Sequence, residues 1–140
     1  MAISYRTGDQ AQQGGLDITI SLTPEEAAAA GHIGDLADWF DTALWALAVL
    51  RTGRVDRTDG HALTANDLHT VINDLDHRLL PRLQGIRDAA VRRHADLGGT
   101  YGDLATAMDT SRSTAQYRRD ALTAKTPSVW ENWATGQQQH

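Results

Sequence analysis

Apolar side chains recur every three or four positions through much of this chain, the spacing that places them on one face of an α-helix. The pattern predicts helices over residues 33–51 and 64–80, and it continues beyond Pro81 to Leu97. Proline lacks a backbone N–H and disfavours a helical conformation in the residue before it. We therefore predict two helices that meet at Leu80, with Pro81 opening the second. One long kinked helix is the alternative.

Residues 16–22 alternate apolar and polar side chains with period two, which predicts a half-buried strand. A lone strand is not stable in water and needs a partner. The candidates are an extended piece at residues 54–57, ahead of a turn at residues 58–60, or the same strand of a second subunit. Residues 1–14 and 135–140 show no periodicity, so we expect both ends to be frayed.

Two further helices are predicted from their first residues. Thr23 can cap a helix and Pro24 fits its first position, so a helix begins here. Near the C-terminus, Thr126-Pro127 opens a short helix that carries Trp130 and Trp133. These tryptophans are three positions apart and form an apolar face, which we expect to pack on residues 100–122 or on a second subunit.

Residues 100–122 are predicted to form two helices separated by a tight turn. Thr100 has an acid three positions later, a capping-box-like pair that begins the first helix. Asp109-Thr110 is the turn, and Ser111 caps a longer second helix. Ala105 has to be small, because two helices that cross steeply leave little space between them.

This segment resembles the helix-turn-helix of bacterial transcriptional regulators and is similar also to the last region of sigma factors. The matching residues are Leu104-Ala105, Met108, Thr110-Ser111 and Ser113-Thr114-Ala115. Asp109 stands where the family usually has Gly, Thr110 where Val is common, and Arg118 where an apolar residue is usual. Asp tolerates a left-handed turn, and Thr has the shape of Val. For Arg118, either its aliphatic stem lies along the core or the second helix is slightly rotated.

The resemblance implies that the start of the second helix enters the major groove of double-stranded DNA. The positions it carries over as base contacts are Arg112, Ser113, Gln116 and Tyr117. Of these, Arg112 suits guanine and Gln116 suits adenine. Contacts to phosphate are expected from Thr100, Ser111, Arg118, Arg119, Arg92 and Arg93.

Charge is divided unevenly along the chain. Residues 1–81 hold 5 Arg and 12 Asp or Glu, a net charge of −7, whereas residues 82–120 hold 7 Arg and 5 Asp, a net charge of +2. The acidic part would repel phosphate, so we expect it to face away from DNA.

Several classes of function are excluded by what the sequence lacks. There is no cysteine, so there is no disulfide or thiolate metal site, and a reducing cytoplasm is expected. No leader or membrane span is expected. His69 and His77 are better explained as solvated positions than as metal ligands. We find no phosphate loop, nucleophile elbow or acid–base pair, and expect neither an enzyme nor a cofactor.

We therefore predict a mainly α fold with a helical N-terminal layer, one short strand and a tri-helical DNA-binding unit. The expected regions are residues 1–80 for dimerisation, 81–125 for DNA binding and 126–140 for a short helix and tail. The expected function is a bacterial, cytoplasmic, sequence-specific DNA-binding repressor. It would be a homodimer, with Trp39, Phe40 and Leu44 in the core or the interface. The alternative is a non-enzymatic interaction module, an adaptor or antitoxin-like protein, that uses the acidic half.

Overall fold

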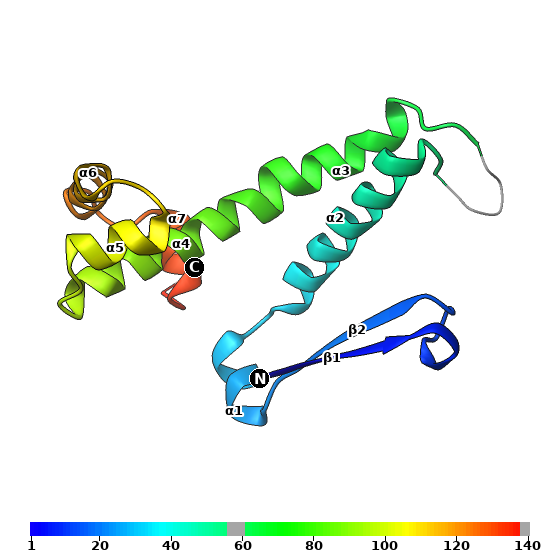
Figure 1. The fold of residues 1–140 in the computed structure, drawn as a ribbon, viewed down its shortest axis with the longest axis horizontal. Coiled ribbons are helices and arrows are strands. Elements are labelled where there is room, and N and C mark those ends of the chain that lie inside the picture. Colours follow the sequence, from blue (N-terminus) through cyan, green and yellow to red (C-terminus); the bar gives the residue numbers. More distant parts are fainter. Residues whose placement is uncertain (56–60, 138–140) are drawn as a thin grey trace. The chain divides into compact units, whose positions relative to one another are not determined.

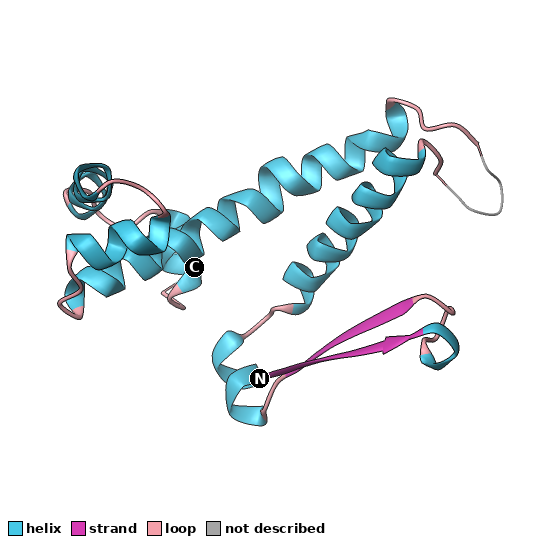
Figure 2. Ribbon diagram, viewed as in Figure 1, coloured by secondary structure: helices cyan, strands magenta, loops and turns pink. Residues whose placement is uncertain are grey.

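The computed structural model describes residues 1–55 and 61–137. The chain forms two compact units, Met1–Asp38 and Trp39–His140. Helices predominate, and the first unit also contains a two-stranded antiparallel sheet (Figures 1 and 2). The predicted mainly α fold is therefore confirmed. Within the described ranges, no helix combines the length and the apolar character that crossing a bilayer requires.

The first unit begins with a β-ribbon. β1, Ala2–Thr7, runs antiparallel to β2, Leu16–Ser21, and all six positions of each strand are paired. The strand predicted at residues 16–22 is thus confirmed, but it is almost wholly exposed rather than half-buried. The expectation that residues 1–14 are frayed is wrong. Residues 3–7 carry the same period-two alternation as β2, although the run is short and lies among small polar residues.

The register of the ribbon gathers its large apolar residues on one face. Ile3 lies opposite Ile20 and Tyr5 lies opposite Ile18, and all four side chains are exposed. Alternate residues of a strand point to opposite faces, so the polar residues between them lie on the other side. The ribbon therefore presents an apolar face.

The partner expected for β2 at residues 54–57 is not the one observed, because β2 pairs with β1. Arg54 instead forms an isolated antiparallel bridge with Ala62. Asp56 and Arg57, like the turn predicted at residues 58–60, lie outside the described residues.

Helix α1, Pro24–Ala30, begins where its capping signal places it. The Thr23 side chain accepts a hydrogen bond from the Glu26 backbone N–H at 3.1 Å, and the Glu26 carboxylate accepts one from the Thr23 N–H at 3.2 Å. This reciprocal capping box satisfies two N–H groups that the helix itself cannot pair. At the other end Gly31 has a φ of 67°, which suits glycine and ends the helix.

Helix α2, Gly34–Thr52, begins in the first unit, and its larger part lies in the second. Ala46 and Val49 are buried, and Thr42 donates a hydrogen bond to Asp74 at 3.2 Å. The rest of its apolar surface is open: Phe40 is 43% exposed and Leu44 is 56% exposed. Helix α2 is therefore only partly covered within this chain.

A continuous helix runs from residue 69 to residue 96 (Figure 1). It consists of α3, His69–Asn73, a π-helical segment, Asp74–Leu79, and α4, Leu80–Asp96. Helical dihedrals persist through both junctions, with φ −61° and ψ −47° at Asn73 and φ −59° and ψ −47° at Leu80. The prediction of two helices that meet at Leu80 is therefore wrong, and the single-helix alternative is correct. The expected boundary between residues 80 and 81 lies inside this helix.

The π-helical segment gives a physical reason why the helix survives Pro81. In a regular α-helix the proline ring clashes with the carbonyl four residues earlier and leaves it without a donor. One wider π turn immediately before the proline changes this spacing and the hydrogen-bond pattern. The π turn therefore accommodates Pro81, and the helix continues through it.

Candidate nucleic-acid interface

Two helices joined by a tight turn form the segment singled out from the sequence. Helix α5, Tyr101–Met108, is capped by Thr100, whose hydroxyl accepts from the Asp103 N–H at 3.0 Å. Helix α6, Arg112–Thr123, is capped by Ser111, which accepts from the Thr114 N–H at 3.1 Å. Both predicted caps are confirmed. They could be predicted because each depends on residues only three positions apart.

The turn between α5 and α6 depends on Asp109. Its φ of 49° and ψ of 54° place it in the left-handed region, and it is the one non-glycine residue with positive φ in the described chain. The next N–H, that of Thr110, donates to the Ala105 carbonyl at 3.0 Å and closes the end of α5. Aspartate adopts this conformation more readily than most residues, as the sequence indicated.

A small core holds α4, α5 and α6 together. It contains Leu104, Ala105 and Ala115, with Val91 and Met108 packed against it. Ala115 is 0% exposed and Ala105 is 7% exposed, so the two helices approach through their smallest side chains. The prediction that Ala105 lies under the following helix is confirmed.

The residues predicted to contact bases lie together on the open side of α6. Arg112, Ser113, Gln116 and Tyr117 are all exposed, and Tyr117 reaches 76%. Their spacing of three and four residues places them on one face, which is distinct from the face that buries Ala115. The first two turns of α6 therefore present four polar side chains next to one another.

The residues predicted to contact phosphate fall into two groups. Thr100 and Ser111 are exposed capping residues, and Arg93 and Arg118 are exposed. The exposure of Arg118 favours the interpretation in which α6 is slightly rotated, since the partly buried positions on this side are Arg119 and Leu122. These four residues have accessible polar groups.

Arg119, in contrast, is held by contacts within the chain. Its guanidinium donates to the Gly99 carbonyl at 2.6 Å and lies 3.8 Å from the centroid of the Tyr101 ring. The Tyr101 hydroxyl in turn donates to Asp120 at 2.7 Å. This set of contacts fixes the start of α5 against the second half of α6, a role that the sequence analysis did not identify.

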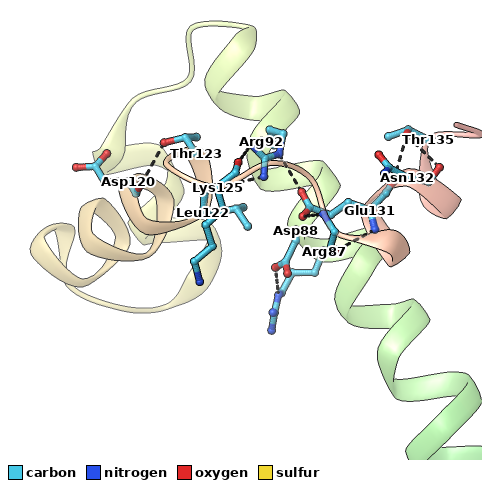
Figure 3. Close-up of polar contacts among 11 residues, drawn as sticks. Arg87, Asp88, Arg92, Asp120, Leu122, Thr123, Lys125, Glu131, Asn132 and Thr135 are labelled. Carbon is cyan, nitrogen blue, oxygen red and sulfur yellow. Dashed lines mark hydrogen bonds and ion pairs between the residues drawn. The ribbon is translucent and has the colours of Figure 1, made fainter.

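Arg92 is also committed within the chain. Its guanidinium contacts Glu131 and the carbonyls of Leu122 and Lys125, at distances of 2.9 to 3.2 Å (Figure 3). Glu131 belongs to α7, Val129–Ala134, and is 3% exposed. Burial by itself would raise the pKa of Glu131. Hydrogen bonds from Arg92 and the Ser128 N–H lower it by more than burial raises it, so the pKa of Glu131 lies below the ordinary 4.5.

The start of α7 shows which signal the sequence analysis missed. Ser128 and Glu131 form a reciprocal capping box, so the helix begins at Val129 rather than at the predicted Thr126-Pro127. A serine followed three positions later by glutamate is the sequence signature of that motif. It would also have identified Glu131 as a fixed residue.

The tryptophans of α7 pack on α4 of the same chain. Arg82 lies 4.5 Å from the centroid of the Trp130 ring and 5.5 Å from that of Trp133. On its other side it lies 4.4 Å from the Trp39 ring. A guanidinium stacked among aromatic rings is attracted to their faces, so Arg82 joins α2, α4 and α7.

Among the described residues, no group of three His, Asp, Glu or Cys side chains is arranged to hold a metal ion. His69 and His77 are both exposed. No protein-family model, curated protein or solved structure matches this chain.

Proposed function

We propose that this protein is a sequence-specific regulator that binds double-stranded DNA through α6. The observation that carries the proposal is the face formed by Arg112, Ser113, Gln116 and Tyr117, which is exposed at the start of a well-capped helix. A helix of this kind fits the major groove, where arginine recognises guanine and glutamine recognises adenine. The opposite face of α6 is packed on α4 and α5, so these four side chains would be held in a fixed arrangement.

Phosphate contacts fix such a helix on the duplex without reading sequence. Arg93 and Arg118 are exposed and suit this role, together with the hydroxyls of Thr100 and Ser111. Arg92 and Arg119 are engaged inside the chain, and we assign them structural roles instead. The proposed phosphate set is therefore smaller than the one expected from the sequence.

We further propose that the regulator is a cytoplasmic homodimer that represses by occupying a palindromic site. The exposed apolar residues of α2 include Phe40, Leu44, Leu47 and Leu50. Trp39 is half-buried against Arg82, so it belongs to the core of the chain. A second copy could cover these exposed residues. A two-fold dimer would then present its two α6 helices, the helices proposed to read DNA, about 34–36 Å apart to successive half-sites.

The decisive experiment is selection of genomic fragments by the purified protein, followed by affinity measurements on the selected site and on random duplex. Arg112→Ala and Gln116→Ala should each weaken binding to the selected site by about 1–3 kcal/mol and change binding to random DNA much less. Arg93→Ala, as the matched control, should weaken both alike and lower the salt slope by about one. An equal loss on both duplexes for Arg112→Ala would contradict base reading.

Light scattering at micromolar concentration tests the dimer. A mass near twice 15.3 kDa is expected, and a mass of 15.3 kDa with and without DNA would contradict both the dimer and the palindromic site.

The alternative function is a DNA-free interaction module. It is favoured by the same exposed leucines of α2, which suit a protein partner as well as a second copy. A salt-dependent shift of duplex DNA separates the two, because a module that makes no phosphate contacts releases no counterions and produces no such shift.

A further inference from the structure

One guanidinium joins α6, the helix proposed to read DNA, to α4 and α7. Arg92 Nε donates to Glu131 Oε1 at 2.9 Å, Nη1 donates to the Lys125 carbonyl at 3.2 Å, and Nη2 donates to the Leu122 carbonyl at 3.1 Å. Arg92 lies on α4, Leu122 lies in the last turn of α6, and Glu131 lies on α7. The three contacts span 30 to 39 residues of sequence (Figure 3).

These contacts complete the C-terminal end of α6. The last carbonyls of a helix have no partner within the helix, and a cation there also interacts favourably with the helix dipole. The planar fork of arginine can reach two carbonyls and a carboxylate at once, which a lysine cannot do. The side chain of Arg92 is 20% exposed and that of Glu131 is 4% exposed, so the pair is shielded from water.

Glu131 is itself anchored, because α7 lies directly on α4. Gly85 of α4 approaches so closely that a Cβ there would lie 2.5 Å from the Trp130 carbonyl oxygen. The capping box at Ser128 and the stacking of Arg82 on Trp130 hold the rest of this short helix. Arg92 therefore ties the end of α6 to a surface that is already fixed.

We propose that Arg92 is a positioning residue: it holds α6 in the orientation needed for DNA recognition and does not itself contact DNA. This inference rests on the proposed function. Helix α6 behaves as a rod, and the residues from Arg112 to Leu122 extend about 15 Å along it. Release of the C-terminal end would let the rod tilt, and the reading face at the other end would move relative to the bases.

The test compares three full-length variants on the selected duplex and on random duplex, at a temperature where all are folded. Arg92→Ala should weaken binding to the selected site about tenfold, comparable to a mismatched base pair, and leave the salt slope unchanged. Arg93→Ala, the matched neighbour, should lower the slope by about one. Val71→Ala removes part of a buried side chain in α3 and should lower the melting temperature while leaving affinity unchanged.

Amide hydrogen exchange supplies a readout that needs no DNA. Arg92→Ala should speed exchange in the last turn of α6 and in α7, whereas Arg93→Ala should not. If Arg92→Ala does not fold, Arg92→Lys serves instead. It keeps the charge beside Glu131, cannot span both carbonyls, and should show a smaller effect in the same direction.

Three results would each overturn the inference. The first is a salt slope for Arg92→Ala that falls as in Arg93→Ala, and the second is an affinity that stays at the wild-type value as in Val71→Ala. The third is unchanged exchange in α6 and α7. If the unaltered protein binds no duplex, the proposed function fails, and hydrogen exchange alone then decides whether Arg92 holds α6.

Discussion

Replacement of Gly85 by alanine tests the close packing of α7 on α4. The added Cβ would lie 2.5 Å from the Trp130 carbonyl oxygen and 2.6 Å from its carbonyl carbon and Cβ. Because ordinary contacts begin near 3.5 Å, α7 has to move by about 1 Å. Overpacking of this kind costs about 1–3 kcal/mol, and the better helix propensity of alanine returns about 1 kcal/mol.

We therefore expect Gly85→Ala to lower the free energy of unfolding by up to about 2 kcal/mol and the melting temperature by up to roughly 6 °C. Circular dichroism measures the unfolding, and tryptophan fluorescence should report movement of Trp130 and Trp133. Gly102→Ala in α5 is the matched control, since the nearest atom to its Cβ would be 3.9 Å away. It should stabilise the protein by about 0.5 kcal/mol. Equal stabilisation by both substitutions would refute the close approach.

Three further predictions concern stability. Asp109→Gly should stabilise the protein by about 0.5–1 kcal/mol, because glycine adopts the observed φ of 49° without strain; destabilisation in thermal unfolding would contradict this. Ser111→Ala should cost about 1 kcal/mol, whereas Ser111→Asp should keep the cap, and equal losses in urea unfolding would count against the capping bond. The depressed pKa of Glu131 means that its carboxylate stabilises the fold above pH 4.5, and that this contribution is lost as the pH falls from 4.5 through the lowered pKa. Glu131→Gln should therefore flatten the acid limb of a plot of stability against pH, and an unchanged limb would show that other groups govern it.

The sequence alone determined the features that depend on neighbours a few residues apart. Thr23, Thr100 and Ser111 each cap a helix through an N–H three positions away, so both partners are visible in one short window. The left-handed Asp109 and the small Ala105 follow from the same local geometry. These features place α5, the turn and α6, and with them the candidate reading face.

Pairing over longer distances in the sequence was decided by the tertiary structure. Arg92 meets Glu131 across 39 residues and Arg119 meets Gly99 across 20, and no local pattern distinguishes these arginines from the exposed Arg93 and Arg118. From the sequence alone, all four arginines are cations that could contact phosphate. Packing engages two of them inside the chain: Arg92 with a buried carboxylate and backbone carbonyls, and Arg119 with the Gly99 carbonyl.

Two of the errors in the fold have physical reasons of the same kind. A strand of six residues among small polar neighbours has little local signal, and β1 becomes visible only because β2 supplies its partner. Pro81 normally signals a helix boundary, yet a π turn before it lets the helix continue, and that choice depends on the packing of the whole helix rather than on the proline itself. Local chemistry therefore set where helices begin, and tertiary contacts decided which strands pair, where a helix continues and which charges stay free.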